Sequence, residues 1–309
     1  MRGMATDPVV RRLLAPPRRP AGRKLAMRRS ATLRESVLLA FSRTIRYARA
    51  VARRAAVEPE ESVHEYRKSV RRVRAVVSLL RPALGRKTAR GFSRELRRAF
   101  AETGALRDAD VLLASLRLVP PGSDPERAEI ESALERESGE DREAARRALE
   151  KGSEILQPLP AALRVVLPET FSMEDLDRGL TRSARRVRAT LERAIETRTD
   201  ADFHEWRKRV KELRYQVEML ASSGSPALRR REKKLSALAE DLGETTDLIL
   251  LEAALQARIA RGAIPDAPAL TAAIHSTIAE RSRELLLRGQ EMFAPPAGDF
   301  AREVLAERG

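Results

Sequence analysis

The sequence HEYRKSVRRVR at residues 64–74 occurs a second time, in altered form, as HEWRKRVKELR at residues 204–214. Both copies begin with histidine, and the whole chain has only three histidines. Finding two of the three at the head of matching basic segments is not a pattern that chance favours. The repeat therefore indicates that one structural unit has been duplicated.

Helical spacing gives each copy a polar and an apolar side. At about 100° per residue, the histidine and four cations of each copy fall within an arc of about 120°. Apolar side chains occupy the opposite side, which we expect to be buried, with Tyr66 and Trp206 in the core. The first stripe is His64, Arg67, Lys68, Arg71 and Arg74, backed by Tyr66, Val70, Val73, Val77 and Leu80. The second stripe is His204, Arg207, Lys208, Lys211 and Arg214, backed by Trp206, Val210, Leu213 and Val217.

The net charge of the chain is concentrated near its start. Residues 1–30 hold nine Arg or Lys and one Asp, so this stretch carries +8 of the total +15 and leaves +7 for the rest of the chain. A moderately basic, Glu-rich body is ordinary for helices with ion-paired faces, so a functional argument depends on where the cations lie. For a single such helix, a solvated face is the more common explanation. The same five-position pattern in two copies favours a binding surface.

Helical patterns dominate the rest of the chain. Aromatic residues make up only 4%, and apolar residues rarely alternate, so strand signals are weak and we predict an all-α protein. Proline and glycine mark the breaks, for example Pro82 with Gly85 and the triplet at 120–122. We expect a basic disordered tail at 1–30, a first helical bundle at 31–156, a proline-rich link at 157–173, a second bundle at 174–293 and a C-terminal tail at 294–309. Bundles related by duplication commonly pack about a pseudo-two-fold axis, which would turn the stripes toward each other.

A second pair of segments follows the stripes in the same order. Gly104 precedes Asp108 by four positions, and Gly243 precedes Asp247 by four, at nearly the same offset as the stripes. We interpret both glycines as helix boundaries, and both aspartates as groups that orient arginines or cap helices.

The stripes and the segment LRDADVL at 106–112 resemble the CHAD family, the conserved histidine α-helical domain. The resemblance covers about residues 31–293. It implies two pseudo-symmetric helical bundles that bind inorganic polyphosphate in a basic groove or pore, with the ten stripe residues as the binding set. Some members of the family also carry a triphosphate tunnel domain with a Glu-x-Glu-x-Lys motif, which this sequence lacks.

The two copies differ at two positions. Glu212 stands where the first copy has Arg72, and Thr246 stands where alignment on the aspartates would place Arg107. Arg72 lies outside the shared arc, so its replacement changes the stripe little. The threonine puts a symmetric role for Arg107 in doubt.

The chemistry of the stripes suits polyphosphate independently of the resemblance. Polyphosphate carries about one negative charge per phosphate and has no bases, so its receptor needs closely spaced donors and no stacking surface. Arginine offers bidentate N–H groups to phosphate oxygens, and lysine offers a mobile charge. Binding through eight cations would release counterions, so affinity should fall steeply with salt. His64 and His204 are candidate pH-sensitive contacts.

Two other functions stay open. One is catalysis, with His64 or His204 attacking a phosphoryl group or acting as acid or base. Phosphoryl transfer normally requires carboxylates that hold Mg²⁺, and Glu65 and Glu205 are expected on the flanks of their helices. Lys68 stands where a zinc motif starting at His64 would need its second histidine. The other is nucleic-acid binding through the basic face and tail, for which recognition motifs and stacking aromatics are scarce. We expect a non-enzymatic protein with no cofactor and no metal, and we expect His275 to be structural.

Composition also sets an expected location. The chain has no cysteine, which excludes disulfides and fits a reducing compartment. It has no apolar run near the roughly 18 residues of a membrane span, and prolines interrupt the first part of the chain where a signal peptide would be apolar. We expect a cytoplasmic protein with no membrane contact, whose partners are polyphosphate and also polyphosphate granules or polyphosphate-metabolising enzymes.

Overall fold

In a computed structural model, the protein is described for residues 32–104, 108–121, 124–137, 142–221 and 225–308. These residues form α-helices and no strand, which confirms the all-α prediction. The expected tail at 1–30 lies outside the described residues.

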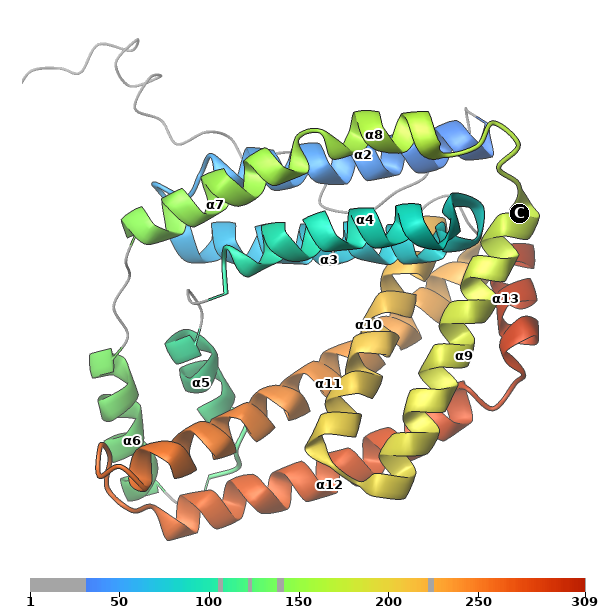
Figure 1. The fold of residues 1–309 in the computed structure, drawn as a ribbon. Coiled ribbons are helices and arrows are strands. Elements are labelled where there is room, and N and C mark those ends of the chain that lie inside the picture. The colour runs from blue at the N-terminus through green and yellow to red at the C-terminus, as the bar shows by residue number, and fades with distance from the viewer. Residues whose placement is uncertain (1–31, 105–107, 122–123, 138–141, 222–224, 309) are drawn as a thin grey trace, which may run out of the picture.

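The first part of the chain forms a layered group of helices (Figure 1). Helix α2 (Leu33–Ala52) packs on α3 (Pro59–Leu79), and α3 packs on α4 (Arg81–Ala101). Helix α7 (Arg142–Leu156) then returns to lie against α2, α3 and α4. The basic helix α3 ends just before Pro82, as expected, and this proline lies in the first turn of α4. Gly85 has a positive φ, a conformation that glycine adopts readily, and it kinks this helix.

The second group of helices starts at residue 173. Helices α9 (Met173–Thr197) and α11 (Pro226–Ile259) both pack on α10 (Asp200–Ala221), and α12 (Pro268–Met292) lies along α11. Ser225 caps α11 by accepting a hydrogen bond from the backbone N–H of Leu228 at 3.2 Å. Proline occupies the first turn of α11, where its fixed backbone suits the start of a helix.

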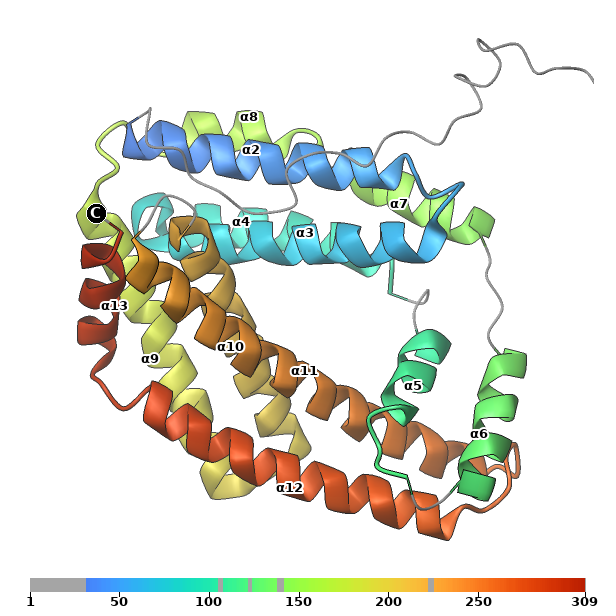
Figure 2. The same ribbon diagram turned by 180° about the vertical axis from the view of Figure 1, so that it is seen from behind.

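Two helices of the first half lie on the second half. Helix α5 (Asp108–Leu116) packs on α11, and α6 (Asp124–Glu137) packs on α5 and α12. Together they bury a hydrophobic cluster that is separate from the main core, with α5 and α6 at the far ends of α11 and α12 (Figure 2). Sequence boundaries at 31–156 therefore do not correspond to one packed bundle.

The structure corrects two expected segments. The link at 157–173 contains α8 (Leu159–Val166), which packs on α2 and α4 and buries Leu163. The expected C-terminal tail contains α13 (Ala297–Ala306), which packs on α9 and buries Phe300 and Val304. Such short helices gain most of their stability from packing on other helices. Their apolar residues therefore did not predict a helix from the local sequence alone.

The main core extends through both halves without interruption. The side chains predicted to back the two stripes are all buried, with Tyr66 and Trp206 fully inaccessible. The predicted apolar side of α3 and of α10 is therefore confirmed.

Candidate functional site

Helices α3 and α10 cross at a steep angle near their carboxyl ends (Figure 1). The side-chain Nε2 of Gln216 donates to the Ala75 carbonyl at 3.1 Å. Beside it, the Arg72 guanidinium donates to Glu218 at 2.7 Å and 3.3 Å, with both side chains buried. Because a buried charge is tolerated only when it is paired, this ion pair fixes the two helices to each other. Arg72, which the sequence placed outside the stripe, belongs to the interface between the halves.

A second contact at the crossing joins the positions that correspond to Arg72 and Glu218 in the other copy of the repeat. Ser78 donates a hydrogen bond to Glu212, and positions 78 and 72 match 218 and 212. Positions 72 and 218 in one pair thus correspond to positions 212 and 78 in the other. This reciprocity is what a local two-fold axis between α3 and α10 requires.

The cations of the first stripe gather around an aromatic ring that no sequence pattern marked. The Arg67 guanidinium lies 4.1 Å from the centre of the Phe100 ring on α4, and Arg71 and Arg74 lie 5.1 Å and 6.0 Å from it. Arg67 also donates to the Thr103 carbonyl at 2.6 Å. Cation–π attraction to one ring thus holds three arginines of the stripe in place.

The second stripe lies against α11 at a position without a side chain. Arg207 is 3.7 Å from Asp247, in agreement with an aspartate that orients an arginine. A Cβ placed on Gly243 would lie 3.3 Å from Nζ of Lys211 and 3.7 Å from Arg207. The sequence predicted a helix boundary at Gly243. That prediction is wrong, because α11 continues through this residue. Its missing side chain makes room for two cations.

Charges from both stripes act on Lys211. Burial is the main cause that lowers the pKa of Lys211 to about 7. The charges of Arg207, Arg71 and Arg214 act in the same direction, because like charges disfavour a protonated amine, and Asp247 opposes them. Arg71 comes from the first half and the other cations from the second. The electrostatic environment of Lys211 thus includes an arginine of the other stripe.

Glutamates partly balance three cations of the stripes. Lys68 lies 3.6 Å from the buried Glu65, and Lys208 lies 3.5 Å from Glu205 but stays exposed. Arg214 is 3.9 Å from Glu218, the glutamate that also pairs with the interface arginine. These carboxylates reduce the surplus positive charge of the stripes.

The two histidines do not meet. His64 precedes Arg72 by eight positions, and His204 precedes Glu212 by eight. At the rise of an α-helix, each histidine lies about 12 Å along its helix from the crossing. Because the helices cross steeply, their amino-terminal ends extend in different directions from the crossing (Figure 1). His64 is exposed, whereas His204 is half-buried and its pKa is lowered by burial and by the adjacent Lys208 and Arg207.

Arg74 extends the first stripe toward a group of charges that sequence reasoning did not find. It is exposed, yet its pKa is lowered, first by desolvation from the surrounding protein. Glu212 and Arg209 are among its charged neighbours. The other arginines of this region lie on α9 and at the start of α4, and no repeat in the sequence marked them.

Other predicted features have plain outcomes. Arg107 lies outside the described residues, as does the side chain of Asp108. His275 is exposed and lies 3.1 Å from Glu252. Within the described ranges, no three His, Cys, Asp or Glu side chains are grouped so that they would hold a metal ion. None of the helices described combines the length and apolar character needed to span a bilayer.

Comparisons with known proteins concern the family and the fold of the chain. A family model, that of the CHAD domain, matches residues 36–256. Among solved structures, the crystal structure of the CHAD domain from the plant Ricinus communis has a similar fold, with a TM-score of 0.61 and 24% sequence identity. That alignment covers 95% of this chain and 97% of the plant chain. Among curated proteins, none matches significantly.

Proposed function

The chain belongs to the CHAD domain family, and from this premise we propose that it binds inorganic polyphosphate along its two basic stripes without altering it chemically. The observation that carries the proposal is that the charges of Arg71, from the first half, and of Arg207 and Arg214, from the second, all act on Lys211. A linear polyanion contacting both helices would offset the repulsion between these charges.

Arginine geometry supports a phosphate ligand. Three guanidinium groups are held at the Phe100 ring. Side chains that are already ordered lose less rotamer entropy when they bind phosphate oxygens. The absent side chain at Gly243 leaves room beside Lys211 and Arg207. A receptor built from ordered donors suits a ligand that has charge and no bases.

The direct test removes four stripe cations from the full chain. We expect R67A/K68A/R207A/K208A to lower polyphosphate affinity at least 100-fold in fluorescence anisotropy, with an unchanged helical circular dichroism spectrum. The control R53A/K87A/K233A/R283A removes the same charge from exposed positions outside both stripes and should change affinity less than threefold. Because residues 1–30 stay intact in both variants, unchanged binding by the stripe variant would overturn the proposal.

Nucleic-acid binding is separated from this proposal by competition. Duplex DNA of equal total charge should displace labelled polyphosphate poorly, because the stripes offer closely spaced donors and no means of reading bases. Displacement by DNA at the same concentration as unlabelled polyphosphate would favour a general polyanion receptor.

Catalysis by the histidines is the remaining alternative. On our proposal, prolonged incubation leaves polyphosphate chain length unchanged on gels and releases no phosphate, with or without Mg²⁺. Chain shortening that disappears in H64A or H204A would show an enzyme instead. Cytoplasmic location and association with polyphosphate granules are further parts of the proposal, testable by imaging a fluorescent fusion beside stained granules.

A further inference from the structure

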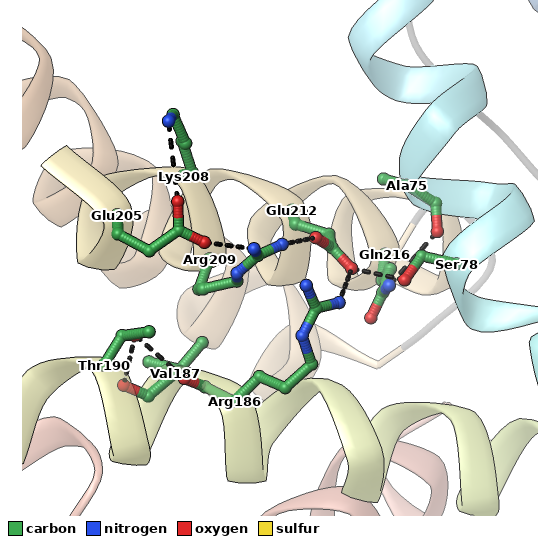
Figure 3. A network of polar contacts seen from close by, with 10 residues as sticks. All are labelled: Ala75, Ser78, Arg186, Val187, Thr190, Glu205, Lys208, Arg209, Glu212 and Gln216. Carbon is green, nitrogen blue, oxygen red and sulfur yellow. Dashed lines mark hydrogen bonds and ion pairs between the residues drawn. The ribbon is translucent and has the colours of Figure 1, made fainter. Parts of the chain in front are cut away.

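A second cluster of cations surrounds Glu212 on the other flank of α10 (Figure 3). Arg186 of α9 donates to Glu212 at 3.1 Å, and Arg209 donates to the other carboxylate oxygen at 3.1 Å. Ser78 also donates to Glu212, and Arg209 pairs in addition with Glu205. The Glu212 carboxylate is therefore shared by three donors.

Three further arginines lie close to this group and have no carboxylate of their own. Arg74, Arg81 and Arg182 make no hydrogen bond or ion pair within the part of the chain that the structure describes, although Arg74 contacts the Phe100 ring. The Nη1 atom of Arg182 is buried and lacks a hydrogen-bond partner. A buried guanidinium nitrogen without an acceptor is costly, and an incoming anion would supply that acceptor.

The charges of the cluster do not balance. Its cations are Arg74, Arg81, Arg182, Arg186 and Arg209, and its anions are Glu205 and Glu212. Five arginines less two glutamates leave a surplus of three positive charges. The repulsion is visible at Arg182, whose pKa is lowered first by burial and then by the charges of Arg81 and Arg186.

This cluster lies on a different surface from the second stripe. At about 100° per residue, Arg209 and Glu212 project from α10 roughly 100° away from Lys208 and Lys211, respectively. The stripe lies against α11, as the approach of Lys211 to Gly243 shows, whereas the cluster lies against α9. Of the ten stripe residues, Arg74 is the one that also belongs to the cluster.

We propose that this arginine cluster is a second anion-binding site, which takes a compact oligophosphate group of the size of inorganic tripolyphosphate. Guanidinium groups from α3, α4, α9 and α10 would surround such a group, and each can offer two parallel N–H donors to phosphate oxygens. A ligand with three or more negative charges matches the surplus of the cluster. The inference rests on the proposed function only for the class of ligand, because its residues, apart from Arg74, lie outside the stripes.

The test measures tripolyphosphate binding to the full chain by calorimetry. The parent should bind at two sites, and R182A/R186A should lose one of them, with at least a tenfold weaker affinity there. The stripe variant R67A/K68A/R207A/K208A should keep the site that R182A/R186A loses. The control R185A removes an exposed arginine from the same helix and should leave both sites unchanged.

A second variant gives an effect of opposite sign. E212Q removes the negative charge that competes with the ligand, so tripolyphosphate should bind about tenfold more tightly. E240Q, at an exposed position on α11, should have no effect. Unchanged binding by both R182A/R186A and E212Q, in proteins whose circular dichroism matches the parent, would overturn the second site. That result would not bear on the proposed function of the stripes. The stripes are tested separately, by the loss of long-chain polyphosphate binding in R67A/K68A/R207A/K208A.

Discussion

The two halves of the molecule contact each other through matched positions but with different chemistry. On one side of the crossing, Arg72 and Glu218 form a buried ion pair. On the other, the matched residues are Glu212 and Ser78, joined by a hydrogen bond that is only partly buried. The Arg72–Glu218 side of the crossing is thus buried, whereas Glu212 on the other side also contacts Arg186 of α9. Matched backbone positions do not imply matched functions.

The buried aromatic residues of the two halves show closer agreement. Tyr66 presses against Gly152 of α7, and Trp206 presses against Gly289 of α12, where a Cβ would collide with each ring. Each half therefore closes its core with an aromatic ring against a glycine of a later helix.

The third helix of each half differs most. Helix α4 ends at Ala101, before Gly104, whereas α11 runs through Gly243 to Ile259. The same residue type follows the end of one helix and makes room for cations in the other. Contacts, rather than the presence of glycine, decided which role applies.

Removing the aromatic rings should have the largest effect on stability. We expect Trp206→Ala to lower the free energy of unfolding by about 5 kcal/mol and Tyr66→Ala by about 4 kcal/mol, because each leaves a cavity in the core. Both rings are fully buried. Since the main core is continuous, urea should unfold each variant in one transition followed by circular dichroism. Val165→Ala, at a position 83% exposed, serves as the control. Two separate transitions would mean that the halves fold independently.

The ion pair at the crossing should outweigh its matched hydrogen bond. Glu218→Ala leaves Arg72 buried without its main partner and should cost about 3 kcal/mol in urea unfolding. Ser78→Ala removes one hydrogen bond and should cost about 1 kcal/mol or less. The effect is small because Glu212 keeps Arg186 and Arg209 as donors. Equal losses would show that the two sides of the crossing are energetically alike.

Polyphosphate affinity should depend on pH through Lys211 and not through its matched residue Arg71. The protonated lysine attracts phosphate, and its pKa of about 7 means that protonation is lost as pH rises through neutrality. Affinity should therefore fall by up to about tenfold between pH 6 and pH 8. Lys211→Arg keeps the charge and should flatten the anisotropy profile above pH 6.5. Persistence of the full slope in that variant would assign the titration to another group.

Substitutions of Gly104, which follows α4, and of Gly243, within α11, should have the smallest effects on stability, and these effects should be of opposite sign. Gly243→Ala improves helix propensity and should stabilise the protein by up to about 1 kcal/mol. Its Cβ would be nearest to the flexible end of Lys211. Gly104→Ala would place its Cβ 3.1 Å from the Ala101 carbonyl, a backbone atom that cannot easily move. That substitution should destabilise the protein by roughly 0.5 kcal/mol. Thermal melts measure both, and a stabilising Gly104→Ala would contradict the assigned roles.

Local periodicity predicted the elements that the chain forms by itself. The buried side of α3 and of α10 followed from helical spacing, since residues three and four apart share a face whatever lies opposite. The same reasoning failed for α13, where Phe300 is buried in a helix that packs on the much earlier α9. It also missed Phe100 and Arg182, because their importance comes from cations on other helices.

The sequence by itself determined that the protein is helical and that two of its helices each carry a basic stripe. These properties depend on intervals of a few residues, which the chain specifies locally. The tertiary structure alone decided that the charge of Arg71 acts on Lys211 and that Arg72 forms a buried ion pair at the crossing. It also decided that Glu212 lies beside the arginines of the second cluster. Charge interactions act through space, so their strength depends on which helices pack together and not on separation along the chain.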